Sequence, residues 1–182
     1  DLTTILNAIY RETGKASVLY QARNLVSEGG AFRRSAFENT LLQEKSDLFQ
    51  IHCNYVQQGN IQRPLTGTVV GGNIRCFLKL AGTEYWPDMQ DKILLLESWS
   101  GGVPKMVTYF SQLRQLGVFR QIKAVLLGTF TEMEQKACAP TIEELVRHYA
   151  GPKLPILKTW EVGHGKDALA VRIGGELTIH VE

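Results

Sequence analysis

Short, uninterrupted aliphatic runs constrain the fold of this chain more than any other feature. Ile93-Leu94-Leu95-Leu96 and Val125-Leu126-Leu127 are too short for core helices and end at polar residues or glycine, so each indicates a buried strand. Segments with helical spacing alternate with these runs, and one of them, Thr141-Ile142-Glu143-Glu144, reads as a capping box. The alternation predicts the α/β class. The expected strands cover residues 49–55, 65–70, 92–97, 122–130 and 154–161, and the expected helices cover 74–81, 104–116 and 141–149.

The two ends of the chain depart from this alternation. Gly174-Gly175 separates two apolar segments, 168–173 and 176–181, and predicts a hairpin that gives the chain an antiparallel finish. At the start, Leu2, Ile5, Leu6 and Ile9 recur at helical spacing, with Asp1 as the N-cap and Gly14 as the stop. We therefore divide the chain into residues 1–46, a helix and a connector with a short helix near 34–42, and residues 47–182, a second domain.

Composition excludes several classes of partner. The 182 residues carry a formal net charge of +2, so charge gives no reason to expect nucleic acid or a membrane surface as a partner. No apolar stretch approaches the roughly 18 residues of a membrane span. Cys53, Cys76 and Cys138 are widely spaced and odd in number, which is typical of reduced thiols in a cytoplasmic protein.

Glu97 and His164 have the settings of catalytic residues. Glu97 closes a buried strand, where a partly desolvated carboxylate needs a cation or hydrogen-bond donors. His164 stands between Gly163 and Gly165, which permit a sharp turn that exposes the imidazole. A carboxylate that orients an imidazole is two thirds of a hydrolase triad, although no serine or cysteine of the chain has a comparable setting. An exposed Glu and a lone surface His are the plainer alternatives.

Other candidates are weaker. Asp167, three residues after His164, would suit a metal turn, but no histidine pair or cysteine cluster completes a site, so we expect no metal. Asn73 follows Gly71-Gly72, and the preferred interpretation is a helix cap. The alternative is a substrate-binding residue. Trp99 could line a substrate groove, as could Trp86, or either could pack in a core. Three further histidines look incidental: His52, His148 and His180.

Several of these motifs together resemble one family, the serine L,D-carboxypeptidases. That family includes the muramoyltetrapeptide carboxypeptidases and the microcin C immunity peptidases. The resemblance covers residues 47–182 in the family's order. Its motifs are Gly71-Gly72-Asn73-Ile74, residues 81–88, residues 92–97, residues 112–119, residues 125–130 and Val162-Gly163-His164-Gly165. It implies a C-terminal swivelling β/β/α-type domain that carries the triad Glu97 and His164, with no cofactor.

The start of the chain resembles the same family. Residues 1–10 are similar to the aspartate and helix that follow the family's nucleophilic serine. By that resemblance the serine would precede Asp1, and the backbone N–H of Asp1 would serve the oxyanion hole. Residues 1–46 would be a short remnant of a flavodoxin-like nucleophile domain. We accordingly expect the first helix not to pack on the C-terminal core.

Two departures from the family's pattern bear on its substrate. Ser98 stands where the family usually has an acidic residue, and Tyr20 is followed by Gln21-Ala22 in place of Gly-Pro. The resemblance implies a cytoplasmic enzyme that removes the terminal D-alanine from a murein tetrapeptide in cell-wall recycling. An exposed apolar stripe on the first helix would favour a homodimer. The alternatives are a microcin C-type immunity peptidase and, for this chain by itself, a non-catalytic binding or assembly domain. Without the serine the chain alone is expected to be inactive.

Overall fold

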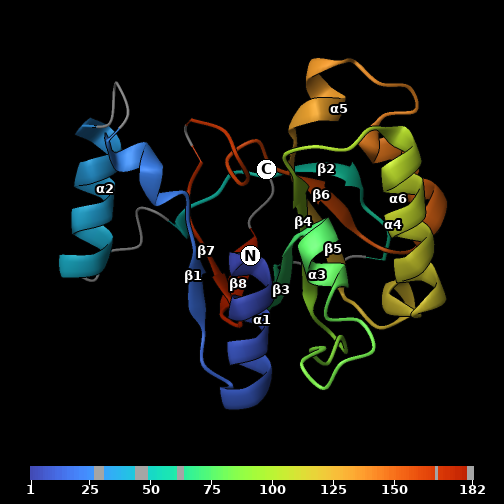
Figure 1. Cartoon of the computed structure of the whole chain (residues 1–182), viewed down its shortest axis with the longest axis horizontal. Coiled ribbons are helices and arrows are strands. Elements are labelled where there is room, and N and C mark those ends of the chain that lie inside the picture. Colours follow the sequence, from blue (N-terminus) through green and yellow to red (C-terminus); the bar gives the residue numbers. More distant parts are fainter. Residues whose placement is uncertain (27–30, 44–48, 61–63, 167, 180–182) are drawn as a thin grey trace.

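A six-stranded mixed sheet forms the centre of the molecule (Figure 1). The structure is a computed structural model, and it describes residues 1–26, 31–43, 49–60, 64–166 and 168–179. The strands β3 (Leu65–Asn73), β4 (Ile93–Ser98), β5 (Ala124–Phe130) and β6 (Ile156–Lys158) run parallel as neighbours. Antiparallel edges are added by β2 (Asn54–Gln57) beside β6 and by β8 (Glu176–Ile179) beside β3. A separate two-stranded sheet pairs β1 (Ser17–Leu19) with β7 (Val171–Ile173).

Helices and the small sheet cover the two faces of the central sheet (Figure 1). One face carries α3 (Ile74–Leu78), α4 (Val103–Gln115) and α6 (Ile142–Ala150). The other carries α1 (Leu2–Thr13) together with β1 and β7. The remaining described helices are η1 (Ala22–Val26), α2 (Ala31–Leu42), η3 (Val118–Arg120) and α5 (Thr131–Gln135).

The aliphatic runs exist because both faces of the sheet are buried. Successive side chains of a strand point to opposite faces, so a strand covered on both sides needs apolar residues at every position. Leu94 and Leu96 pack with Phe110 on the side of α4, whereas Ile93 and Leu95 join a second cluster on the side of α1. All four residues of this run are fully buried. The expected buried strands are therefore confirmed, with boundaries shifted by a few residues.

The expectation that the first helix does not pack on the core is wrong. Helix α1 docks on β3 and α3 through polar contacts. The Asn7 side chain, fully buried, donates to the Gly71 carbonyl at 2.8 Å and accepts from the Gly71 N–H at 2.9 Å. Thr4 Oγ1 donates to the Cys76 carbonyl at 3.2 Å. Leu6 does enter the core, but Leu2, Ile5 and Ile9 stay exposed, so the apolar stripe and the docking face coincide only in part.

The expected hairpin at Gly174-Gly175 is also wrong in its pairing. The chain does turn there, with Gly174 at φ +81°, but β7 pairs with β1 and β8 pairs with β3. Val69 of β3 separates the two strands, because it accepts from Gly174 N at 2.7 Å and donates to Gly175 O at 3.0 Å. A glycine pair marks a turn, and which strands then pair is decided by partners distant in sequence.

The expected strand at 49–55 is correct only at its end, since β2 begins at Asn54. Ile51 and Cys53 alternate toward the core as expected, but the intervening His52 N–H donates to a side chain, Glu161 Oε2, at 2.6 Å. The capping box at Thr141 is confirmed. The boundary between residues 46 and 47, Asp167 and His180 lie outside the described residues. Within the described ranges no helix combines the length and apolar character needed to cross a bilayer.

Candidate active site

The carboxyl ends of the parallel strands meet at one edge of the sheet, and the candidate residues gather there. Asn73 ends β3 and is paired in register with Glu97 of β4. Thr129 lies near the end of β5, and His164 follows β6 on a loop. Polar side chains at the carboxyl edge of a parallel sheet are placed where α/β proteins usually bind ligands.

Glu97 and His164 are in direct contact. Glu97 Oε2 lies 2.6 Å from His164 Nδ1. The Glu97 side chain is 6% exposed and the His164 side chain 23% exposed, so the carboxylate is buried beneath an imidazole that reaches the surface. An ionised carboxylate can only accept, so Nδ1 donates and Nε2 is the nitrogen that can take a proton from another group. The sequence predicted this meeting of two residues 67 positions apart.

The turn that carries His164 is built against Thr129. The Thr129 N–H donates to the Val162 carbonyl at 2.9 Å, and the His164 N–H donates to Thr129 Oγ1 at 3.4 Å. Gly163 has φ +136°, and a Cβ at that position would lie 2.1 Å from Thr129 Oγ1. The flanking glycine is therefore needed for close approach as well as for backbone conformation.

Trp99 lies beside the imidazole. Its ring centroid is 5.5 Å from that of His164 and its residue is 52% exposed. The loop that carries it is held by Glu132 of α5, which accepts from Gly101 N at 2.6 Å and donates its own N–H to Trp99 O at 3.2 Å. A hydrogen bond from Lys136, and then the one from Gly101, lower the pKa of Glu132, so its carboxylate stays ionised.

Asn73 and Asp1 lie at the same edge. Asn73 caps α3, accepting from Cys76 N at 3.3 Å, which is its plainer interpretation. Its backbone N–H donates to Thr3 Oγ1 at 3.1 Å, and Asp1 in turn caps α1 by accepting from Thr3 N at 3.0 Å. The N-terminus of α1 thus adjoins the strand end that pairs with Glu97.

Two residues of the connector support the histidine loop and were not predicted. Asn24, 5% exposed, donates to the Gly165 carbonyl at 3.0 Å. Arg23 donates to the His164 carbonyl at 3.4 Å. Both lie in η1, 141 residues away in sequence, within a stretch whose mixed composition gave no periodic signal.

Other candidates lie elsewhere. Trp86 packs against Phe77 with centroids 4.7 Å apart, as a core residue. His52 pairs with Glu161, and His148 contacts Tyr149 edge-on. Among the described residues no group of three or more His, Cys, Asp and Glu side chains could hold a metal.

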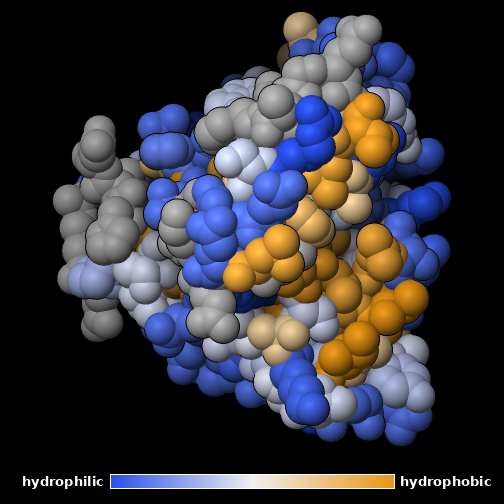
Figure 2. All heavy atoms as spheres, turned by 90° about the vertical axis from the view of Figure 1, so that its left-hand side faces the viewer, coloured by the Kyte–Doolittle hydropathy of each residue, from blue (hydrophilic) through white to orange (hydrophobic). Residues whose placement is uncertain are grey.

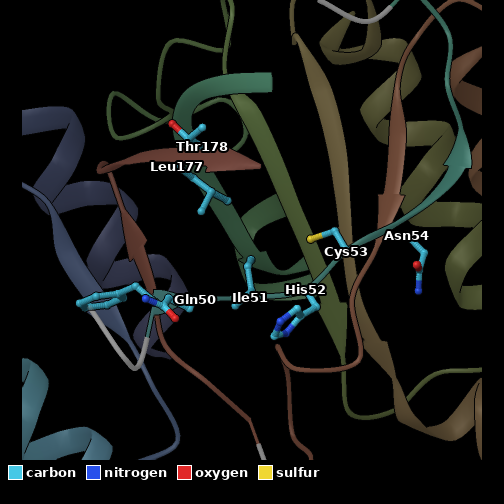
Figure 3. A pocket seen from close by; sticks show the side chains of 8 residues that line it. Gln50, Ile51, His52, Cys53, Asn54, Leu177 and Thr178 are labelled. Atoms are coloured by element: carbon cyan, nitrogen blue, oxygen red, sulfur yellow. The ribbon is translucent and has the colours of Figure 1, made fainter. Parts of the chain in front are cut away.

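A hollow of the surface lies away from Glu97 and His164. It measures about 410 Å³ and lies between residues 49–54 and β8, where Ile51, Cys53 and Leu177 line it (Figure 3). Burial, and then the charge of Glu161, raise the pKa of the Cys53 thiol to about 12, so the thiol stays protonated at neutral pH. A cavity of about 20 Å³ adjoins Glu97 and is lined in part by Leu19 and Gly163. The contact between Glu97 and His164, and not cavity size, identifies the candidate site.

Comparison with known proteins agrees on one family. Residues 66–179 match the model described as the LD-carboxypeptidase C-terminal domain. A Treponema pallidum protein whose naming as a carboxypeptidase is provisional is 25% identical over 203 residues, covering 100% of this chain and 60% of that protein. The microcin C7 self-immunity protein MccF of Escherichia coli is 26% identical over 147 residues, covering 78% of this chain and 40% of MccF.

Solved structures of this family share the fold, as two examples show. MccF in complex with glutamyl sulfamoyl guanosine matches with a TM-score of 0.73 at 17% identity, over 96% of this chain and 61% of that one. A muramoyltetrapeptide carboxypeptidase from Oxalobacter formigenes matches with a TM-score of 0.71 at 22% identity, over 98% of this chain and 61% of that one. The α/β class is confirmed, and the chain spans about six tenths of the length of these relatives.

Proposed function

The chain belongs to the LD-carboxypeptidase family, and from that membership we propose that it is the acid–base part of a serine peptidase. The proposed reaction removes the terminal D-alanine from a murein tetrapeptide in cell-wall recycling. The observation that carries the proposal is the 2.6 Å contact between Glu97 Oε2 and His164 Nδ1 at the carboxyl edge of the sheet. The fold shared with a muramoyltetrapeptide carboxypeptidase supports the choice of substrate.

In the proposed mechanism the nucleophile is a serine at the position that precedes Asp1 in the parent protein. His164 Nε2 takes the serine proton as the oxygen attacks the scissile carbonyl, and Glu97 stabilises the imidazolium that results. The backbone N–H of Asp1 stabilises the oxyanion. His164 then gives its proton to the leaving amine of D-alanine. Water, deprotonated by the same imidazole, attacks the acyl-enzyme, and the imidazolium returns that proton to the serine oxygen as the acid product leaves. The mechanism uses no cofactor and no metal.

Trp99 supports a second candidate, a microcin C-type immunity peptidase. An aromatic ring that is half exposed and lies 5.5 Å from the His164 ring could stack on a nucleobase. MccF, which shares the fold, has been solved in complex with glutamyl sulfamoyl guanosine, which contains a guanine base. In that case Trp99 would bind the nucleotide portion, and Asn73 would contact the peptide portion.

We further propose that the protein is cytoplasmic, because its thiols are free, and that it is a homodimer.

The test measures D-alanine release from murein tetrapeptide by the parent protein, with its upstream region present. Glu97→Gln should lower kcat by on the order of 10⁴, because the imidazolium loses its charged partner. His164→Ala should lower it at least as far. His148→Ala, a histidine outside the site, should have near-normal kcat. Normal turnover by Glu97→Gln would contradict the proposed roles.

Two further measurements separate the alternatives. Faster cleavage of a peptidyl nucleotide than of the tetrapeptide, with a loss specific to Trp99→Ala, would favour the immunity peptidase. Residues 1–182 alone should not hydrolyse either substrate, since hydrolysis needs a nucleophile within reach of His164. If the parent protein also turned over neither substrate, a non-catalytic binding or assembly role would remain.

A further inference from the structure

Lys158, the last residue of β6, is a buried lysine outside the Glu97–His164 pair. Its side chain is 5% exposed. Its Nζ donates to the Gly128 carbonyl at 2.7 Å and lies 2.6 Å from Glu134 Oε1 of α5. It also lies 4.2 Å from the centroid of the Trp160 ring. Burying an ammonium costs free energy that a single ion pair often fails to recover, so stability alone does not account for this group.

The two backbone atoms that this ion pair binds flank a single residue. Lys158 binds the carbonyl of Gly128, and Glu134 Oε1 accepts from the N–H of Phe130 at 2.9 Å. Thr129 lies between them. The Lys158–Glu134 pair therefore fixes the backbone on both sides of Thr129.

This segment of β5 is a bulge opposite Glu97. Leu96 is paired with Leu127 and Ser98 with Phe130, so that two residues of β5, Gly128 and Thr129, stand against Glu97 alone. A bulge leaves backbone groups out of the ladder and redirects the local side chains. Here Lys158 and Glu134 take the places of the missing strand partners.

The bulge in turn contacts both members of the candidate acid–base pair. Thr129 binds the turn that carries His164 by two hydrogen bonds. Its N–H donates to the Val162 carbonyl at 2.9 Å, and its Oγ1 accepts from the His164 N–H at 3.4 Å. Gly128 lies so close to Glu97 that an added Cβ would come within 3.1 Å of Glu97 Cβ. A shift of the bulge would therefore displace His164 relative to Glu97.

We propose that Lys158 and Glu134 are positioning residues, an ion pair that locks the bulge at Gly128-Thr129 and so holds His164 Nδ1 against Glu97. Neither side chain touches the imidazole. They act through the backbone of β5, and their effect is geometric.

The test uses NMR of residues 1–182, with the His164 Nδ1–H proton and the imidazole ¹⁵N shifts as the readout of its bond to Glu97. Lys158→Met removes the donor to Gly128 O, and Lys158→Met/Glu134→Gln removes both charges while keeping an acceptor for Phe130 N. Both variants should lose the Nδ1–H signal and the single tautomer. The matched control is Lys123→Met, because Lys123 Nζ donates to the Thr66 carbonyl at 2.8 Å beyond the opposite end of β5. Its His164 signals should be unchanged.

A folded double variant, judged by circular dichroism, whose His164 signals match those of the unchanged chain would overturn the proposal. If that variant does not fold, the proposal is tested with Glu134→Gln alone, which keeps the size of the side chain. It should broaden or shift the Nδ1–H signal, and an unaltered signal would equally overturn the proposal.

For catalysis the inference rests on the proposed function. In the parent protein the double variant should lower kcat by on the order of 10² with KM unchanged, as small displacements of catalytic groups do. Absence of turnover in the unsubstituted parent would defeat the proposed function and leave the NMR result to decide the positioning role.

Discussion

At the scale of single residues, Gly163 determines whether His164 can reach Glu97. Any side chain at this position would meet Thr129 Oγ1 and adopt an unfavourable positive φ. We expect Gly163→Ala to lower the free energy of unfolding by about 1–3 kcal/mol and to weaken the His164–Glu97 bond. Urea denaturation and the His164 Nδ1–H signal measure the two effects.

The neighbouring Gly165 is the matched control for this change. A Cβ there would meet nothing within 4 Å, so Gly165→Ala should alter stability by no more than about 0.5 kcal/mol. Equal losses from the two glycine variants would show that the tight approach to Thr129 does not matter.

Single residues also show how far sequence could predict the site. Glu97 and His164 could be predicted from their immediate neighbours, because Glu97 follows an aliphatic run and His164 lies between two glycines. Lys158 and Glu134 did not, because they are 24 residues apart and each alone looks like an ordinary surface charge. The bulge that they bind leaves no composition signal, since it is a property of how β5 pairs with β4.

At the scale of elements, helix α1 is held by its polar side. Asn7 satisfies both backbone groups of Gly71, and all of these atoms are buried. Asn7→Ala would leave an unpaired N–H and an unpaired carbonyl, each costing about 1–3 kcal/mol. We expect a matching fall in the free energy of unfolding, measured by urea denaturation.

The control for Asn7 lies on the same helix. Thr13 Oγ1 bonds only locally and in an exposed setting, to Ile9 O and from Lys15 N. Thr13→Ala should therefore cost clearly less than Asn7→Ala. A larger loss from Thr13→Ala would mean that α1 is stabilised from its end and not from its contact with β3.

The elements that the sequence predicted well are those whose signals lie within the element itself. The buried strands and the long helix α4 were predicted because their signals, an uninterrupted aliphatic run and a helical period, are local in the sequence. The docking of α1 and the partners of β7 and β8 were missed, because they depend on hydrogen bonds such as those of Asn7 and Val69 to distant backbone. An amphipathic pattern indicates that a helix has an apolar face, but not which face docks.

At the scale of the whole molecule, an apolar surface lies over α1 and β1. Leu2 is 58% exposed, Ile5 54%, Ile9 38% and Val18 44%, and Figure 2 shows hydrophobic surface on this side of the molecule. Such a patch favours association. We expect residues 1–182 to self-associate at high concentration in sedimentation velocity, and Ile5→Glu to shift them toward the monomer.

Leu116 provides a comparison at another site. It is 39% exposed at the end of α4, so Leu116→Glu should leave the association unchanged. A chain that stays strictly monomeric at all concentrations would contradict the prediction.

The anchoring of α1 by Asn7 has a consequence for which changes of length the chain can tolerate. Each residue of a helix adds a rotation of about 100° and a rise of about 1.5 Å. One additional residue between Asp1 and Asn7 would therefore rotate Asp1 by that angle about the helix axis relative to Asn7. Asn7 would remain on Gly71 while Asp1 left the carboxyl edge of the sheet. Substitutions on the outer face of this stretch should therefore be far better tolerated than single-residue insertions or deletions. The number of residues between Asp1 and Asn7 is therefore fixed by the two points at which this part of the helix is held, Asn7 on Gly71 and the N-terminus at the edge of the sheet.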